Sequence, residues 1–320
     1  MLPIHRFLKK LKFYRYFILW TKYIVLPGFA PLPLYTVVVF FVKEIQKESL
    51  VNKASALSYN FMMAIFPSII FLFTLIPYIP IQNFQNQLLA LIGLILPKNA
   101  YLAFEATFED IVKNQNGKLL SVGFILALFF STNGTHTLMQ AFNKSSLVTE
   151  TRSWLKQRLV ALNLTLLTAF ALILGVGVMV VGEFIINGIK STLRFNDSNF
   201  WIYLIAISRW AIVVAVYFVT TSILYRYGPS NPKKWKFFSP GSWLATILAI
   251  VTSVGFAYYI NNFANYNKVY GSIGTLLVIM VWLYLNSIII LVGYELNASV
   301  DLSKRSISLE KPNKINSFKH

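Results

Sequence analysis

The residue that most directly indicates chemistry in this chain is Arg209, which stands inside a long apolar stretch. An arginine in a transmembrane helix costs about 2.5–3.5 kcal/mol to insert, so its side chain should face the interior of a helical bundle and hold an anion. Glu183 is the expected partner by depth, and Glu295 lies nearer the opposite membrane face. Two interpretations stay open: a buried ion pair or gate that fastens helices, or a docking site for an anionic headgroup or substrate.

Amide side chains inside apolar stretches form a second set of candidates. Asn60 and Asn133 lie at similar depths from the same end of two stretches, so they can meet at one level and form a polar cleft for a substrate. Asn286, Gly293 and Asn297 recur at helical spacing and predict a small or polar stripe that faces other helices. Hydrogen bonding between helices would by itself account for these amides.

Proline and glycine inside the apolar stretches indicate how the helices bend and pack. Pro67 lies near the middle of its stretch, where a missing backbone hydrogen bond predicts a kink. Gly175 and Gly177 share one stretch, and Gly271 and Gly274 open another. These glycines predict close approach of helices, with a hinge as the alternative.

The residue types on which most enzymes depend are scarce or scattered. The chain contains no cysteine, which excludes disulfides, thiolate catalysis and cysteine-ligated metals. Its three histidines lie far apart in the sequence, its 11 acidic residues are spread along the chain, and no Walker A loop is present. We therefore expect a protein that is not an enzyme and that binds neither a metal nor a cofactor.

Six apolar stretches, separated by polar segments, carry most of these candidate residues. They lie at about 55–79, 118–138, 158–182, 200–224, 240–262 and 272–297. About 20 residues at roughly 1.5 Å per residue cross the roughly 30 Å hydrocarbon core of a bilayer, where helices satisfy their own backbone. With 56% hydrophobic and 12% charged residues, the chain is predicted to be an all-α polytopic membrane bundle of six transmembrane helices.

The segments around the six stretches are too short to bury cores of their own. We expect residues 1–53 to form a basic, amphipathic and partly inserted N-terminal segment, 54–298 the membrane domain, and 299–320 a basic tail. Basic and aromatic residues alternate in the N-terminal segment, which predicts helices at the membrane interface. Leu34–Val42 is apolar but too short to cross, so it should enter part-way or pack beside the bundle.

The net charge of +18 is distributed unevenly between the two sides of the predicted bundle. Alternate polar segments carry 22 and 6 lysines and arginines, with Arg209 inside a stretch. By the positive-inside rule, the basic segments and both termini lie in the cytoplasm. The expected partners are membrane lipids, whose anionic headgroups would contact the cytoplasmic face. Nucleic acid is not an expected partner, and formation of a homo-oligomer stays open.

Several segments between residues 35 and 300, taken together and in order, resemble a known family. They are Ala54–Asn60, Phe66–Pro67, Ser131–Gly134, Glu150–Arg152, Lys156–Arg158, Leu224–Arg226, Pro240–Ser242, Tyr266–Gly274, Trp282–Leu285 and Gly293–Ala298. On these segments the chain resembles the YihY/BrkB family of bacterial inner-membrane proteins, formerly labelled ribonuclease BN-like. The resemblance implies six helices in the inner membrane and a misassigned nuclease label. One departure is Asn60, where the family pattern more often has an aromatic residue.

The resemblance also implies a role in envelope biology, including export or flipping of amphiphilic molecules. The leading hypothesis is a transporter or flippase for an anionic, lipid-like envelope molecule. Arg209 would attract the headgroup, and Asn60 and Asn133 would contact the substrate. Tyr266 and Tyr270 would shape the outer end of the path. A membrane scaffold that organises envelope enzymes without transport is the alternative, and a ribonuclease is the third hypothesis.

Overall fold

The computed structural model contains helices and no strand among the residues that it describes, which are 12–25, 28–29, 32–46, 49–78, 115–145, 148–193, 198–230, 235–263 and 272–316. The helices are α2 (Lys12–Tyr23), α3 (Leu34–Ile45), α4 (Ser49–Leu75), α7 (Gly117–Ser145), α8 (Trp154–Leu193), α9 (Ser198–Tyr227), α10 (Pro240–Phe263) and α12 (Ser272–Asn316), with a 3-10 turn, η1 (Ile76–Tyr78), after α4. The predicted all-α fold is confirmed.

Six of these helices are long and apolar enough to cross a membrane, namely α4, α7, α8, α9, α10 and α12. Each coincides with one predicted stretch, which confirms a multi-pass bundle. Each helix extends past at least one of its predicted ends, and α12 continues to Asn316, so most of the segment predicted as a tail is helical. Hydropathy marks where apolar side chains stop, whereas the hydrogen-bonded backbone of a helix can continue past that point.

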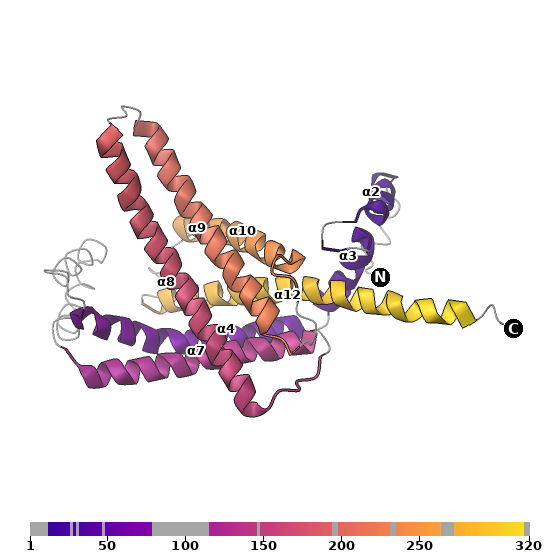
Figure 1. Ribbon diagram of the computed structural model, residues 1–320, viewed down its shortest axis with the longest axis horizontal. Helices are drawn as coiled ribbons and strands as arrows, with labels where there is room; N and C mark the ends of the chain where they lie inside the picture. Colours follow the sequence, from indigo (N-terminus) through magenta and orange to yellow (C-terminus); the bar gives the residue numbers. More distant parts are fainter. Residues whose placement is uncertain are drawn as a thin grey trace.

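The long helices pack as neighbours along the chain and around α12. α8 and α9 run side by side as a long hairpin at a steep angle to α4 and α7 (Figure 1). α4 packs along α7, α12 contacts α3, α4 and α10, and α9 contacts α10. α12 is therefore the helix that joins the N-terminal helices to the bundle.

Small residues let α4 and α7 approach closely. A Cβ atom added to Gly123 would lie 3.1 Å from the backbone nitrogen of Phe71, and one added to Gly134 would lie 2.9 Å from the Phe61 ring. Both contacts are tighter than ordinary side-chain packing. Glycine at these positions brings the two backbones together, as is typical of helix pairs in lipid.

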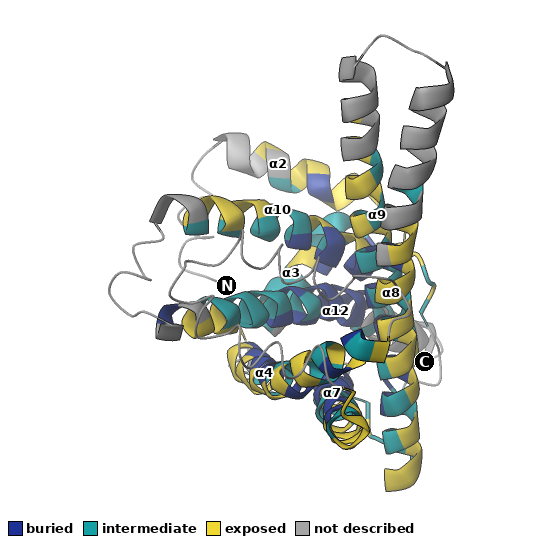
Figure 2. Cartoon of the chain, turned by 90° about the vertical axis from the view of Figure 1, so that its left-hand side faces the viewer, coloured by how far each residue is buried: buried dark blue, intermediate teal, exposed yellow. Residues whose placement is uncertain are grey.

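The most deeply buried aromatic residues lie where α7 and α9 end and α10 begins. Phe142 stacks on Tyr294 with ring centroids 4.0 Å apart, and Tyr225 meets both rings edge-on. The Tyr225 hydroxyl donates to the carbonyl oxygen of Ile290 at 2.7 Å. Figure 2 shows buried residues gathered along α12 and its neighbours, whereas exposed residues run along α8. Exposed apolar side chains are expected on helices that face lipid.

The N-terminal helices lie outside the six-helix bundle. Val37 of α3 is fully buried, in a cluster with Leu296 and Val300 of α12. The short apolar segment 34–42 thus packs against α12, one of the two arrangements expected for it, and its partial insertion in the membrane stays a prediction. α2 exposes large aromatic side chains, including Trp20 and Tyr23, as expected for a helix at a membrane interface.

Candidate functional site

Helix ends and connections that carry lysines and arginines meet at one end of the bundle. We define the basic end as residues 49–60, 133–145, 148–158, 225–230, 235–241 and 293–304, which come from α4, α7, α8, α9, α10, α12 and the described parts of the connections between them. The hydrogen bonds described below join these segments to one another. The alternating charge pattern predicted that they share one side of the membrane, and the structure places them together.

A buried ionic cluster links three helices at the basic end. The Lys53 ammonium of α4 lies 3.5 Å from Oε1 of Glu295 on α12 and donates to the Ser145 hydroxyl of α7 at 2.8 Å. Ser145 donates to the same Glu295 oxygen at 2.5 Å. The Lys53 and Glu295 side chains are only 11% and 5% exposed. Glu295 therefore lies in an ion pair with Lys53, a partner that the sequence analysis did not propose, and its role as a gate stays a prediction.

A second ionic cluster ties the α7–α8 connection to the α9–α10 connection. Arg152 donates to both carboxylate oxygens of Glu150, at 2.7 and 2.8 Å, and to the carbonyl oxygen of Gly228 at 3.0 Å. Asn143 donates to Glu150 at 2.6 Å and accepts from the Ser230 backbone at 2.8 Å. The hydrogen bonds from Arg152 lower the pKa of Glu150 below its ordinary value.

The two asparagines predicted to line a cleft lie on facing helices but bind different partners. Asn60 donates to its own helix at Ala56 and to the Thr137 hydroxyl of α7 at 3.3 Å. Asn133 accepts from the Arg158 guanidinium of α8 at 2.5 Å. Both amides therefore join helices, as expected if their role is to form hydrogen bonds between helices. Their role in binding a substrate stays a prediction.

The polar stripe predicted on the last helix forms the contact between α12 and α10. A Cβ atom on Gly241 would lie 2.0 Å from the carbonyl oxygen of Gly293, so the two backbones touch. Asn297 accepts from the Gly241 backbone and donates to the Ser239 hydroxyl, each at 2.8 Å, which caps the start of α10. Asn286 instead donates to Trp282 within α12. The stripe is confirmed at Gly293 and Asn297.

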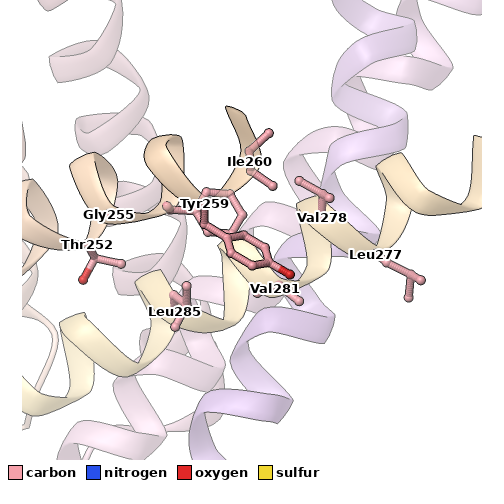
Figure 3. Close-up of a pocket in the computed structure, with 9 residues that line it drawn as sticks. Thr252, Gly255, Tyr259, Ile260, Leu277, Val278, Val281 and Leu285 are labelled. Atoms are coloured by element: carbon pink, nitrogen blue, oxygen red, sulfur yellow. The ribbon is translucent and has the colours of Figure 1, made fainter. Parts of the chain in front are cut away.

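An apolar groove lies between α10 and α12, beyond the Gly241–Gly293 contact. Its volume is about 560 Å³, and residues of both helices line it (Figure 3). Its lining residues are Thr252, Gly255, Phe256, Tyr259, Ile260, Leu277, Val278, Val281 and Leu285. Gly255 has open space where a side chain would be, which contributes to the hollow. The groove has the size of a small-molecule site but offers few polar groups.

Arg209 is exposed on α9, so the expectation that it faces the interior of the bundle is wrong. The α8–α9 hairpin, which carries Arg209, stands at a steep angle to α4 and α7 (Figure 1). A long arginine side chain can reach toward headgroups from such a position. The side chain of Glu183, and Tyr266, Tyr270 and Gly271 as a whole, fall outside the described residues.

The other residues predicted to govern packing or hinges have different surroundings. Gly175 is buried, and a Cβ atom there would lie 2.5 Å from Val216 of α9, so it is a close-packing position. Gly177 has open space around it, so no close helix contact exists there and only the hinge stays a prediction. Gly274 is buried near the start of α12, and α4 continues as a helix through Pro67.

Sequence reasoning missed the partners of Glu295 and the hydrogen-bonded role of Glu150. Lys53 stands just before the apolar residues of α4, so hydropathy assigned it to the flank. Its distance from Glu295 along the chain gives no signal of contact. Glu150 and Arg152 are two residues apart in a short polar connection, a spacing that could have suggested a local ion pair. Among the described residues, no group of three or more His, Asp or Glu side chains is positioned to hold a metal.

The fold and these contacts define a helical multi-pass membrane protein with a hydrogen-bonded basic end and an apolar groove. The chain belongs to the Virulence factor BrkB family, which matches residues 41–315. This match confirms the resemblance to the YihY/BrkB family.

Relatives of similar length share most of the chain. The putative ribonuclease-like protein YfkH of Bacillus subtilis is 33% identical over 254 residues, which are 79% of this chain and 91% of that protein. A UPF0761 membrane protein of Tolumonas auensis is 24% identical over 268 residues, 82% of this chain and 84% of the relative. Another UPF0761 membrane protein, from Haemophilus influenzae, is 25% identical over 268 residues, which are 82% of this chain and 93% of that protein. No solved structure matches.

These relatives define the class but no reaction. UPF0761 membrane proteins are not a known enzyme family, and the ribonuclease-like label of YfkH is a legacy name. The function of the chain must therefore be argued from its own geometry.

Proposed function

We propose that the protein transports or flips an anionic, amphiphilic envelope molecule across the bacterial inner membrane. In this proposal the basic end and both termini are cytoplasmic, as the charge distribution favours. The observation that carries the proposal is the apolar groove between α10 and α12 (Figure 3). It lies between two helices that expose large apolar side chains such as Val251 and Val281.

The chemistry of the groove favours a hydrocarbon chain over a polar solute. A polar molecule there would lose hydrogen bonds to water and regain few, at a cost of roughly 1–3 kcal/mol for each unpaired group. An acyl chain has no such cost and gains contacts with Leu277, Val278 and Leu285. The groove therefore suits the apolar part of a lipid-like substrate.

The contact between Gly241 and Gly293 holds α10 and α12 together on the side of the groove that is nearer the basic end. Asn297 lies about 12 residues beyond Leu285 on α12, which corresponds to roughly 18 Å. An amphiphile of ordinary lipid length spans that distance. Movement of a headgroup between the two ends would require α10 and α12 to separate at these glycines.

Arg209 retains a proposed role at the other membrane face. Its side chain is exposed on α9 and also interacts within the protein, and an anionic headgroup would have to contact it alongside that interaction. Tyr266 and Tyr270, in the segment before α12, are proposed to shape the outer end of the path. An Arg209→Gln variant that inserts normally should slow translocation, and an unchanged rate would remove the headgroup role.

Translocation of a fluorescent phosphatidylglycerol in proteoliposomes tests the proposal. Gly255→Trp and Val281→Trp fill the groove and should reduce the rate at least tenfold. Leu172→Trp, on an exposed position of α8, adds the same bulk outside the groove and should leave the rate unchanged. If the wild-type protein does not accelerate translocation of this or other anionic amphiphiles, the transport proposal fails and a scaffold acting through the basic end takes its place.

A further inference from the structure

A second cavity lies at the basic end, on the same helix pair as the apolar groove. It has a volume of about 360 Å³ and is lined by the start of α10, by α12 and by Gly28. Gly28 has a φ of +90°, and a Cβ atom there would lie 2.8 Å from the Pro240 ring. Glycine at this position lets the N-terminal segment close one wall of the cavity.

Two lysines from different elements line this cavity. Lys236 precedes α10 and is exposed, and Lys304 of α12 lies 3.5 Å from the carbonyl oxygen of Gly28. Asp301 also lines it, one turn before Lys304 on α12, and interacts with other residues of the protein. The two ammonium groups outnumber the carboxylate, so the cavity favours an anion.

The start of α10 is not itself the anion site. The backbone N–H of Gly241 donates to Asn297, and that of Ser242 donates to the Ser239 hydroxyl at 3.2 Å. These donors are already used within the protein. An anion in the cavity would therefore depend on the lysine side chains, which makes the site testable by substitution.

Exposed aromatic side chains lie beside the cavity. Phe238 lines the cavity and is 69% exposed, and Trp243, one turn into α10, is 51% exposed. Both pack against Phe218 of α9, with ring centroids 5.5 and 4.7 Å away. Exposed aromatic rings beside lysines are typical of the layer where acyl chains meet headgroups. A ligand here would have a polar part in the cavity and an apolar part against these rings.

We propose that this cavity binds the phosphate headgroup of an anionic phospholipid from the membrane leaflet at the basic end. The inference deepens the proposed function, since it supplies the class of headgroup and its entry point. Lys236 and Lys304 would hold the phosphate, and Phe238 and Trp243 would contact the glycerol and upper acyl chain. Asp301 limits how much negative charge the cavity accepts.

Binding to the purified full-length protein in nanodiscs tests this inference without a transport assay. The probe is a fluorescent phosphatidylglycerol, with phosphatidylcholine of the same acyl composition as the neutral comparison. Lys236→Gln and Lys304→Gln should each weaken phosphatidylglycerol binding about fivefold, the effect of one lysine near a lipid surface. Asp301→Asn should strengthen it, because a repulsive charge is removed. Binding of phosphatidylcholine should change little in all three variants.

Lys144→Gln is the matched control, because Lys144 is exposed at the basic end but does not line the cavity. It removes the same charge and should leave binding unchanged. Equal losses in Lys144→Gln and the cavity variants would overturn the inference and indicate a diffuse attraction to the basic surface. Competition by millimolar inorganic phosphate as strong as that by the lipid would also overturn it, since the site would then select a free anion.

The two proposals can fail separately. If lysine variants lose lipid binding while the wild-type protein moves no lipid, the cavity stands and the transport proposal fails. If groove variants block translocation while Lys236→Gln and Lys304→Gln bind normally, transport stands and the headgroup site fails.

Discussion

The two ends of the α10–α12 pair differ in how closely the helices pack and in the polarity of the residues between them. At the basic end, backbone contact between Gly241 and Gly293 and the hydrogen bonds of Asn297 hold the helices together. Toward the other end, the same helices leave a groove of about 560 Å³ with an apolar lining. Polar and small residues thus fasten one half of the pair, and side chains that face lipid leave the other half open.

This contrast indicates which part of the helix pair can change shape. Interactions at the basic end are specific and buried, so breaking them should be costly. The groove is lined mainly by apolar side chains, so an acyl chain that enters it replaces one apolar surrounding with another. We therefore expect substitutions to affect stability at the basic end and lipid binding at the groove.

The largest effect on stability is expected from breaking the buried ion pair. Lys53→Met leaves the Glu295 carboxylate without its cation and should destabilise the protein by about 3–5 kcal/mol. The double variant Lys53→Met, Glu295→Met should recover much of this loss, because no unpaired charge remains. Thermal unfolding in detergent measures both. Lys156→Met, at an exposed position of α8, is the control. Additive losses in the double variant would show that the two residues act independently.

A smaller effect is expected at the helix contact. Gly241→Ala places a methyl group against the Gly293 backbone, which must move, and should destabilise the protein by about 1–3 kcal/mol. Gly177→Ala adds the same atom in open space and should be neutral. The unfolding temperatures of the two variants provide the comparison. If Gly177→Ala destabilises as much as Gly241→Ala, the difference between open and close-packed glycines does not govern stability.

The smallest effect is expected at the connections of the basic end, and it depends on pH. Because Arg152 lowers the pKa of Glu150, the ionised carboxylate stabilises the folded state above the unfolded pKa of about 4.3. This contribution is lost as the pH falls below that value and through the lower folded pKa. Glu150→Gln should therefore lower the unfolding temperature at neutral pH, with the difference shrinking in acid. A difference that stays constant down to the most acidic pH tested would contradict this assignment.

Sequence reasoning succeeded where the bilayer imposes a local constraint. The length of each apolar stretch predicts a crossing helix, and the spacing of Gly293 and Asn297 predicts one contact face. The ion pair between Lys53 and Glu295 depends on three helices that meet only in the folded chain. The groove depends on how two apolar faces fit together, for which hydropathy has no signal.

Arg209 shows why a strong local signal can still mislead. The cost of an arginine in lipid is real, but it can be reduced by a tilted helix from which the side chain reaches the surface. The residues near Arg209 do not specify how the α8–α9 hairpin packs against α7 and α10, so the exposure of this side chain has no signal in its local sequence (Figure 1).

The most direct test is to photo-crosslink a phosphatidylglycerol whose acyl chain carries a diazirine to the protein in nanodiscs. We predict that the modified peptides map to 252–260 of α10 and 277–285 of α12, and that Gly255→Trp removes this labelling. Labelling spread evenly over all exposed helix faces, with α8 modified as strongly as the groove and no response to Gly255→Trp, would contradict the claim that the α10–α12 groove binds an amphiphile.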